Sequence, residues 1–144
     1  MYANENFRDD LHHVCRTLVH AGADVTIPGC KGLTPLHAAA GVGDSDMTCM
    51  LLQAGAQPNA ADCDGETPLH RAVAFGFQDV CAALVDADAD PAIRCKTIGL
   101  ANLLNGAHFD FSETHKSEGI SSLELASMFR RHRVVSLLIC QMSR

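Results

Sequence analysis

The side chains that could do chemistry in this chain of 144 residues are its eight histidines and seven cysteines. At short spacing, such residues bind zinc or form a nucleophile with its general base. No two cysteines are spaced as C-x-x-C, and no Ser/His/Asp or Cys/His arrangement follows from local spacing. Glycine-rich phosphate-binding motifs are also missing. The sequence therefore predicts no catalytic site, no metal site and no cofactor.

Two of the histidines instead lie at the same place in a repeated motif. Thr34–His37 reads T-P-L-H, and the same four letters recur at Thr67–His70, a shift of 33 along the chain. At the same shift, Ala-Gly-Ala at 21–23 recurs at 54–56, and less well as Ala-Asp-Ala at 87–89. Matches at one fixed shift over three units indicate an internal repeat.

A fourth unit follows at a longer shift. The segment 119–123 aligns with 65–69 at a shift of 54, in place of 33. The difference of 21 is the length of an insertion between the third and fourth units. The inserted segment contains leucines and phenylalanines, so it either folds back on the array or presents a docking segment.

One unit is predicted to contain two short helices. A threonine and a proline begin the first helix, because the hydroxyl caps it and proline has no N–H to leave unpaired. Gly43 ends that helix, and Met47, Met50 and Leu51 form the apolar stripe of a second one. Two short helices cannot bury their own apolar faces, so neighbouring units must stack.

The repeat length of 33 and the T-P-L-H-x-A signature resemble the ankyrin repeat. The resemblance implies an all-α ankyrin-repeat solenoid of about four units, in a single domain 1–144. The units span about 1–33, 34–66, 67–93 and 117–144, with the insertion at about 94–116. The outer two are degenerate, because residues 1–7 lack the signature and Ser121–Glu124 replaces T-P-L-H. The resemblance also implies that His37 and His70 are structural and bind backbone near the loops.

In ankyrin proteins, partners usually lie against the loop tips and the exposed side of the first helices. By register, the loop-tip residues are Lys31, Leu33, Asp64 and Glu66, beside Cys30, Cys63, Glu118 and Ile120. The helix residues are Val42, Asp44, Ala74, Phe75, Phe77, Met128, Phe129 and Arg131. Phe75 stands where the fold requires no aromatic residue, so it either anchors an interface or packs onto a neighbouring unit.

Cys30 and Cys63 lie one repeat apart, with Cys95 near the same register. Stacked helices lie roughly 8–10 Å apart, which exceeds the limit of about 7 Å between Cα atoms for a disulfide. At that spacing, neighbouring loops could not share one zinc ion either. We therefore expect neither a disulfide nor a metal between them.

Composition and charge disfavour several classes of function. The formal net charge of −6 disfavours nucleic-acid binding. No apolar stretch approaches the roughly 18 residues that span a membrane, and the N-terminus lacks a secretory signal, so we expect a cytoplasmic or nuclear protein. Residues 1–93 carry 4 basic and 13 acidic residues, whereas residues 94–144 carry 7 basic and 4 acidic. The acidic part is expected to steer a partner with a basic surface.

These observations favour a non-catalytic module that binds another protein, as an adaptor, a scaffold or an inhibitor. Two alternatives remain open. The chain could be a regulatory ankyrin fragment of a larger enzyme or channel, or a homo-oligomer that associates through its uncapped ends.

Overall fold

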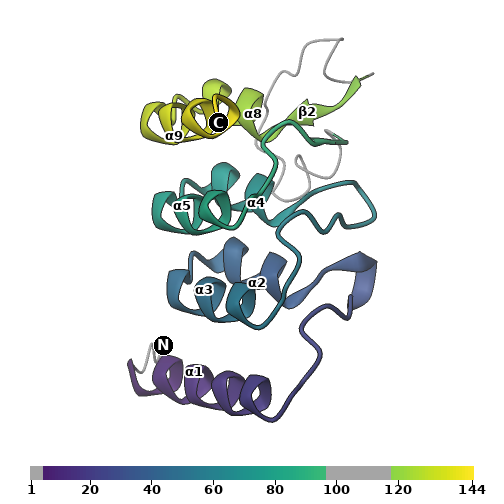
Figure 1. Ribbon diagram of the computed structural model, residues 1–144, viewed down its shortest axis with the longest axis vertical. Helices are drawn as coiled ribbons and strands as arrows, with labels where there is room; N and C mark the ends of the chain where they lie inside the picture. Colours follow the sequence, from purple (N-terminus) through teal and green to yellow (C-terminus); the bar gives the residue numbers. More distant parts are fainter. Residues whose placement is uncertain (1–4, 97–117) are drawn as a thin grey trace.

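The computed structural model describes residues 5–96 and 118–144. Its helices are α1 (Glu5–His20), α2 (Pro35–Val42), α3 (Ser45–Gln53), α4 (Pro68–Phe75), α5 (Gln78–Asp86), α8 (Ser122–Met128) and α9 (His132–Met142), with a 3-10 turn η1 (Cys30–Gly32). Figure 1 shows two stacked columns of helices. The inner helices α2, α4 and α8 lie beside the projecting loops, and the outer helices α1, α3, α5 and α9 lie on the side away from the loops. The predicted all-α repeat solenoid is therefore confirmed. In this described part of the chain, no helix is long and apolar enough to cross a membrane.

The inner helices begin and end as their sequences dictate. Before α2 and α4 the threonine has an extended backbone, and proline occupies the first helical position. Gly43 and Gly76 end these helices with φ of 75° and 77°. This left-handed conformation costs other residues about 1–2 kcal/mol. The outer helices α3 and α5 begin just after these glycines, so each unit is a tight helical pair.

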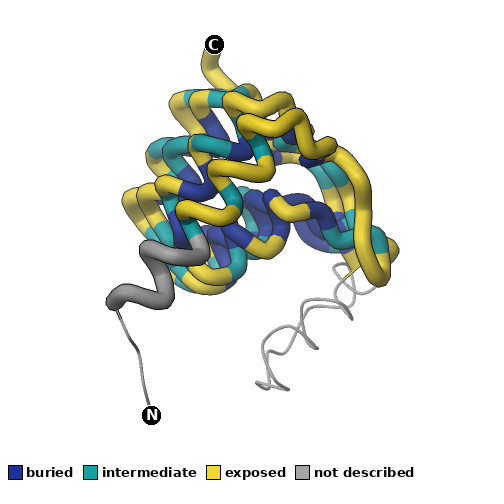
Figure 2. Tube along the Cα trace, turned by 90° about the horizontal axis from the view of Figure 1, so that it is seen from below, coloured by how far each residue is buried: buried dark blue, intermediate teal, exposed yellow. Residues whose placement is uncertain are grey.

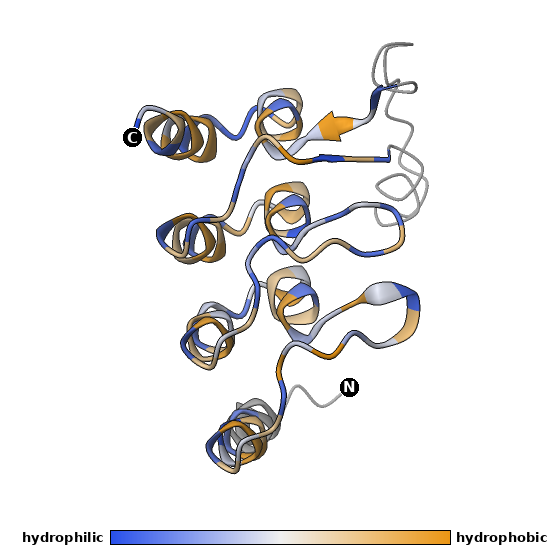
Figure 3. Ribbon diagram, turned by 45° about the vertical axis from the view of Figure 1, so that its right-hand side comes forward, coloured by the Kyte–Doolittle hydropathy of each residue, from blue (hydrophilic) through white to orange (hydrophobic). Residues whose placement is uncertain are grey.

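The hydrophobic core lies between the two columns of helices. Residues at the same position of each repeat contribute to it in successive units. Leu51, Leu84 and Leu138 occupy equivalent positions of three outer helices, and all are buried. Leu36 and Leu69, at one position of two inner helices, have no exposed surface. Burying one such side chain contributes about 1.5–3 kcal/mol. Figure 2 shows buried positions where the helices face one another, and Figure 3 shows hydrophobic residues recurring on the helices from layer to layer.

The first unit contains one long helix instead of two short ones. The register places a short inner helix at about 2–9, but α1 runs without interruption over 16 residues. The reason is local, because Asp10 and Leu11 stand where Gly43 and Asp44 turn the chain in the second unit, and no glycine is available to end a helix there. Since α1 takes an outer position, no inner helix precedes α2 among the described residues.

A small antiparallel hairpin joins the third and fourth units. Strand β1 (Arg94–Cys95) pairs with β2 (Ile120–Ser121). Arg94 also donates hydrogen bonds to the carbonyl oxygens of Glu118 and Gly119, which holds the returning strand. The predicted insertion at about 94–116 includes β1 and supplies most of the connection between the two strands. Its residues from 97 on lie outside the described residues, as does the prediction that it folds back or docks.

We expect a variant in which Asn-Gly replaces residues 97–117 to keep the fold, because both strands and the bonds of Arg94 lie outside the replaced segment. A short connection with Asn-Gly suits an antiparallel hairpin. The melting temperature should stay within about 4 °C of that of the full chain, which corresponds to roughly 1 kcal/mol for a domain of this size. Loss of cooperative melting, followed by far-UV circular dichroism, would show that the replaced segment stabilises the fold.

Candidate functional site

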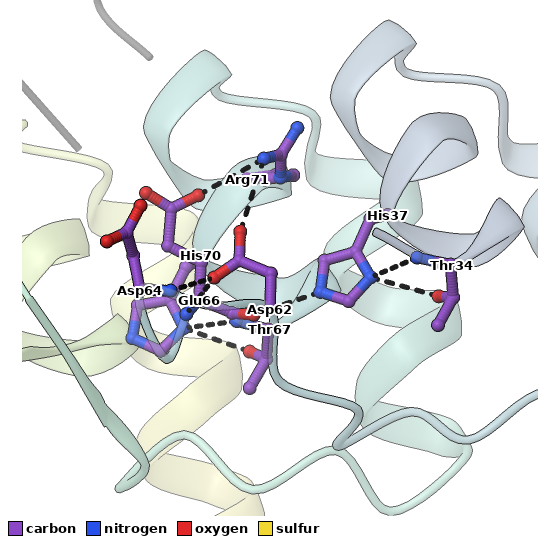
Figure 4. Close-up of polar contacts among 8 residues, drawn as sticks. All are labelled: Thr34, His37, Asp62, Asp64, Glu66, Thr67, His70 and Arg71. Atoms are coloured by element: carbon purple, nitrogen blue, oxygen red, sulfur yellow. Dashed lines mark hydrogen bonds and ion pairs between the residues drawn. The ribbon is translucent and has the colours of Figure 1, made fainter. Parts of the chain in front are cut away.

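The two repeated histidines join each unit to the loop of the next (Figure 4). The backbone N–H of Thr34 donates to Nδ1 of His37 (3.1 Å), and the Thr34 hydroxyl lies 2.9 Å from the same nitrogen. Since a backbone N–H can only donate, Nδ1 must accept, and the neutral ring carries its proton on Nε2. Nε2 therefore donates to the carbonyl oxygen of Glu66, 2.9 Å away. The structural role that the resemblance implied for His37 is confirmed.

His70 repeats this arrangement one unit later. Its Nδ1 accepts from the N–H of Thr67 (3.2 Å), and its Nε2 donates to the carbonyl oxygen of Ile120 (3.2 Å). The bonds made by Nε2 of His37 and His70 span 29 and 50 residues. The difference between these spans equals the length predicted for the insertion. The longer connection therefore leaves the bond between neighbouring units unchanged.

In the fourth unit, Glu124 takes the place of the histidine. Its carboxylate accepts hydrogen bonds from the N–H and the hydroxyl of Ser121 (2.9 and 3.1 Å), which together with the return bond form a capping box. A carboxylate cannot donate to another loop, so the series of bonds ends at this unit. Glu124 instead pairs with Arg94 of the hairpin at 3.1 Å.

Both histidines are fully buried. Burial lowers the pKa of His37 and lowers that of His70 from 6.5 to about 4, because the interior disfavours the charged ring. A proton on Nδ1 would also face the N–H of the threonine. Both rings are therefore neutral near pH 7, and both are occupied by the scaffold.

A charged cluster lies beside the histidines on the loop between the second and third units (Figure 4). Arg71 pairs with Asp62 at 3.5 Å and with Glu66 at 3.4 Å. Only 1% of Glu66 is exposed, and neither of its carboxylate oxygens has a hydrogen-bond partner in the described structure. Burial raises the pKa of Glu66 from 4.5 to about 7. Sequence reasoning missed Arg71, although it is the charged residue at the register position of Ala38.

A row of apolar side chains runs along the ends of the inner helices. Val42, Phe75 and Phe129 occupy one register position, and residues of the turns fill the space between them. A Cβ added at Gly43 would lie 2.5 Å from the ring of Phe77, so that ring covers Gly43. In the same way, the guanidinium of Arg131 covers Gly76, where an added Cβ would lie 2.6 Å away.

We name the residues Val42, Phe75, Phe77, Phe129 and Arg131 the Phe75 strip. The ring centroids of Phe75 and Phe77 are 6.1 Å apart. The guanidinium carbon of Arg131 lies 6.0 Å from the centroid of Phe129, at the outer limit of a cation–π contact. Val42 is 68% exposed and Phe75 39% exposed. The strip is thus an apolar surface that includes one cation.

Four of the predicted contact residues are not on the surface. Ile120 lies in β2 and has no exposed area. Glu66 lies in the cluster described above, and Ala74 is part of the core. The carboxylate of Asp44 caps α3 by accepting from the N–H of Met47 (3.0 Å), and it also contacts His12 of α1. The expectation that these side chains are exposed is wrong, because neighbouring elements cover positions that register alone places outside. The remaining predicted residues are exposed (Lys31, Val42, Phe75) or half-buried (Leu33, Asp64, Phe77, Met128, Phe129, Arg131).

The loop tips of neighbouring units touch. The N–H of Cys63 donates to the carbonyl oxygen of Lys31 (2.9 Å). One repeat later, the N–H of Lys96 donates to the carbonyl oxygen of Asp64 (2.8 Å). The spacing of roughly 8–10 Å expected from helix packing is therefore wrong for the loops, whose backbones approach more closely than helices do. In the described ranges, no three metal ligands gather at one point, and the exposed thiols of Cys30 and Cys63 are free.

A family model described as ankyrin repeats, in three copies, matches residues 1–95. The chain belongs to the ankyrin repeat family. A comparison with curated proteins finds no matching sequence. Ankyrin repeats are protein–protein interaction modules in general, and they are typically non-catalytic. The fourth unit lies beyond the matched residues, but the capping box of Ser121 and the buried Leu138 give it the same construction.

Replacing Glu66 with glutamine should stabilise the protein at pH 8, and the gain should shrink toward pH 5. The raised pKa means that the native state binds this proton more tightly than the unfolded chain does. The resulting stabilisation is complete below pH 4.5 and is lost as the pH rises through about 7. The shift corresponds to at most about 3 kcal/mol. Urea unfolding at pH 5, 6.5 and 8 measures this gain in the free energy of unfolding, with Asp86→Asn at an exposed position of α5 as control. A gain that does not change with pH would contradict the raised pKa.

Acid should destabilise the protein through His70, whose pKa is lowered by burial. Its contribution is complete above pH 6.5 and is lost as the pH falls through about 4, by at most about 3 kcal/mol. The measurement belongs in the Glu66→Gln background, because Glu66 has the opposite dependence over part of this range. There, the further change His70→Gln should flatten the decline of the free energy of unfolding between pH 6.5 and 4. An equally steep decline in both variants would assign the acid sensitivity to other groups.

Proposed function

We propose that this chain binds a partner protein through the Phe75 strip and the adjoining loop tips, and that it does no chemistry of its own. The exposure of apolar side chains at one register position carries this proposal. The helical turns require Gly43 and Gly76, and Phe77 packs over Gly43, whereas Val42 and Phe75 stay exposed. Contiguous exposed apolar surface on a soluble protein often marks a binding site.

The chemistry of the strip indicates what a partner would offer. Aromatic side chains and arginine are the residue types enriched at energetic centres of interfaces. Phe75 and Phe77 present an apolar surface, and the half-buried Arg131 presents donors for a carboxylate or a carbonyl oxygen. A partner segment with an apolar side chain over Phe75 and an acceptor near Arg131 would satisfy both.

The charge of the chain suggests what kind of surface the partner has, and the repeat register suggests how the chain is organised. Residues 1–93 hold 13 of the 17 acidic residues, which supports a partner with a basic surface near Asp64 and the other loop residues. We further propose that the chain, 1–144, is one domain with an insertion at about 94–116. Such a module would act as an adaptor, a scaffold or a competitive inhibitor in the cytoplasm or the nucleus.

The variant Phe75→Ala should lose partner binding while the array stays folded. Truncating a central aromatic anchor costs about 2 kcal/mol or more, which is roughly a 30-fold loss of affinity. The first measurement is quantitative mass spectrometry of proteins retained from a lysate by the wild type and by the variant. The affinity for a retained protein is then titrated with purified components, beside the melting temperature of both chains.

Ile139→Ala is the matched control, because Ile139 is also a large exposed apolar residue but lies on the outer helix α9. It should retain the partner at wild-type affinity. If Phe75→Ala lowers binding only as far as it lowers the folded fraction, the residue belongs to the core. Unchanged binding by Phe75→Ala would remove the strip from the interface.

A further inference from the structure

The turn between α8 and α9, in the uppermost layer of Figure 1, carries three arginines within four residues. We name Arg130, Arg131 and Arg133 the basic turn. Arg130 and Arg133 are exposed, and Arg131 is half-buried. None of the three forms an ion pair with a described residue, since the ion pairs of that part of the chain use other cations. The charges of the basic turn are therefore available to a ligand.

The same turn has the opposite charge in the two preceding units. In the repeat register, Asp46 of α3 and Asp79 of α5 stand where Arg133 stands in α9. An acidic side chain in the first turn of a helix interacts favourably with the positive end of the helix dipole, and a basic one does not. The first turn of α9 holds no acidic residue. The stability of the helix therefore gives no reason for an arginine at this position.

Arg130 departs from a second local preference. Its φ of 54° lies in the left-handed region, at the position that Gly43 and Gly76 occupy in the preceding units. Glycine adopts this conformation readily, whereas a residue with a side chain is strained in it. Residues that break local preferences without a compensating contact are expected at functional sites. Arg130 and Arg133 both meet this description.

Arg131 joins the basic turn to the Phe75 strip. Its guanidinium covers Gly76 of the preceding unit and lies 6.0 Å from the ring centroid of Phe129. Its Nε is buried and has no hydrogen-bond partner among the described residues. Charges that serve only to keep a terminal repeat soluble belong on its outer face. Arg131 lies instead against the neighbouring unit, beside the apolar side chains of the strip.

We infer that the basic turn binds a run of aspartate or glutamate side chains in the partner segment whose apolar anchor lies over Phe75. The inference rests on the proposed function, because Arg131 belongs to both surfaces. Phe75 and Phe129 occupy one register position of neighbouring units, so they lie roughly 8–10 Å apart. An extended chain covers about 3.3 Å per residue. The acidic run is therefore expected about three residues from the anchor.

Other occupants fit this surface less well. Residues 1–93 carry 13 acidic and 4 basic residues, so the units beside the basic turn would repel a nucleic acid that lay along the array. A second copy of the chain would offer the exposed Asp86, Asp88 and Asp90. Only alanines stand between these aspartates, so they bring no large apolar side chain to the strip. A segment with both an apolar anchor and acidic residues matches both surfaces.

Two substitutions that suit the fold remove the charge. Arg130→Gly restores the residue type of Gly43 and Gly76, and Arg133→Asp restores the acidic residue of the preceding units, so the double variant should stay folded. The matched control, Arg16→Asp with Arg144→Gly, changes the net charge equally at exposed positions of α1 and of the C-terminus. Far-UV circular dichroism compares the fold of all three chains.

The probe is a fluorescein-labelled peptide with one leucine, a spacer of three residues and three glutamates. Its affinity is titrated by fluorescence polarisation at low salt, where charge pairs are least screened. We expect saturable binding by the wild type and by the control. The double variant should bind at least tenfold more weakly, and so should the wild type when lysines replace the glutamates of the peptide.

Absence of saturable binding, or equal binding by the wild type and the double variant, would overturn the inference. A single-stranded DNA that binds the basic turn more tightly than the peptide does would also overturn it. So would a dimer, seen by sedimentation velocity, that dissociates in the double variant, because a second copy would then be the occupant.

Phe75→Ala distinguishes a failure of the proposed function from a failure of this inference. It should weaken binding of the leucine peptide, and it should leave unchanged the weaker binding of a peptide with serine in place of leucine. If Phe75→Ala changes neither and the double variant still loses the peptide, the strip is not an interface and the basic turn still binds acidic side chains.

Discussion

The hydrogen bond from a buried histidine to the carbonyl oxygen of the next loop is the constraint on which the rest of the structure depends. It fixes the register between neighbouring helical pairs, and it requires a neutral ring because Nδ1 already accepts from the N–H of the capping threonine. A buried polar group without its partner costs about 1–3 kcal/mol, so a unit that slipped along the stack would be penalised at both ends of the bond. His37 and His70 make the same bond over 29 and 50 residues. The bond therefore fixes the position of the residue that accepts it, whatever the length of the connection before that residue.

The same bond explains why an acidic side chain is buried between two units. The carbonyl oxygen of Glu66 is held by His37, and its N–H is held by the carboxylate of Asp62 (2.9 Å). With both backbone groups fixed, the side chain is directed inward, where Arg71 compensates its charge from 3.4 Å without a hydrogen bond. Arg71 is drawn over α2 in turn, to 4.0 Å from a Cβ added at Gly41. Loop and inner helices thus become one surface against which a partner can lie.

Features that depend on local geometry or fixed spacing were predictable from the sequence. The helix ends at Gly43 and the shared position of the two histidines belong to this group, and so does the register of the Phe75 strip. The uninterrupted α1 could also have been foreseen, since residues 10–11 contain no glycine. The burial of Glu66 and Asp44 could not, because it depends on a neighbouring loop in one case and on His12 of α1 in the other. The pairing of Arg71 with Glu66 could not be predicted either, because it depends on how the loop folds against α4.

The two uncovered surfaces meet at one residue of α2. Val42 begins the Phe75 strip, and it also lines the apolar groove between α1, α2 and α3. Between these surfaces α2 is rigidly held, by the bonds of His37 at its start and by the ring of Phe77 over Gly43 at its end. A close-packed scaffold of this kind does not deform gradually. Because Val42 belongs to both surfaces, a ligand of the strip and a ligand of the groove would influence each other by direct contact at this residue.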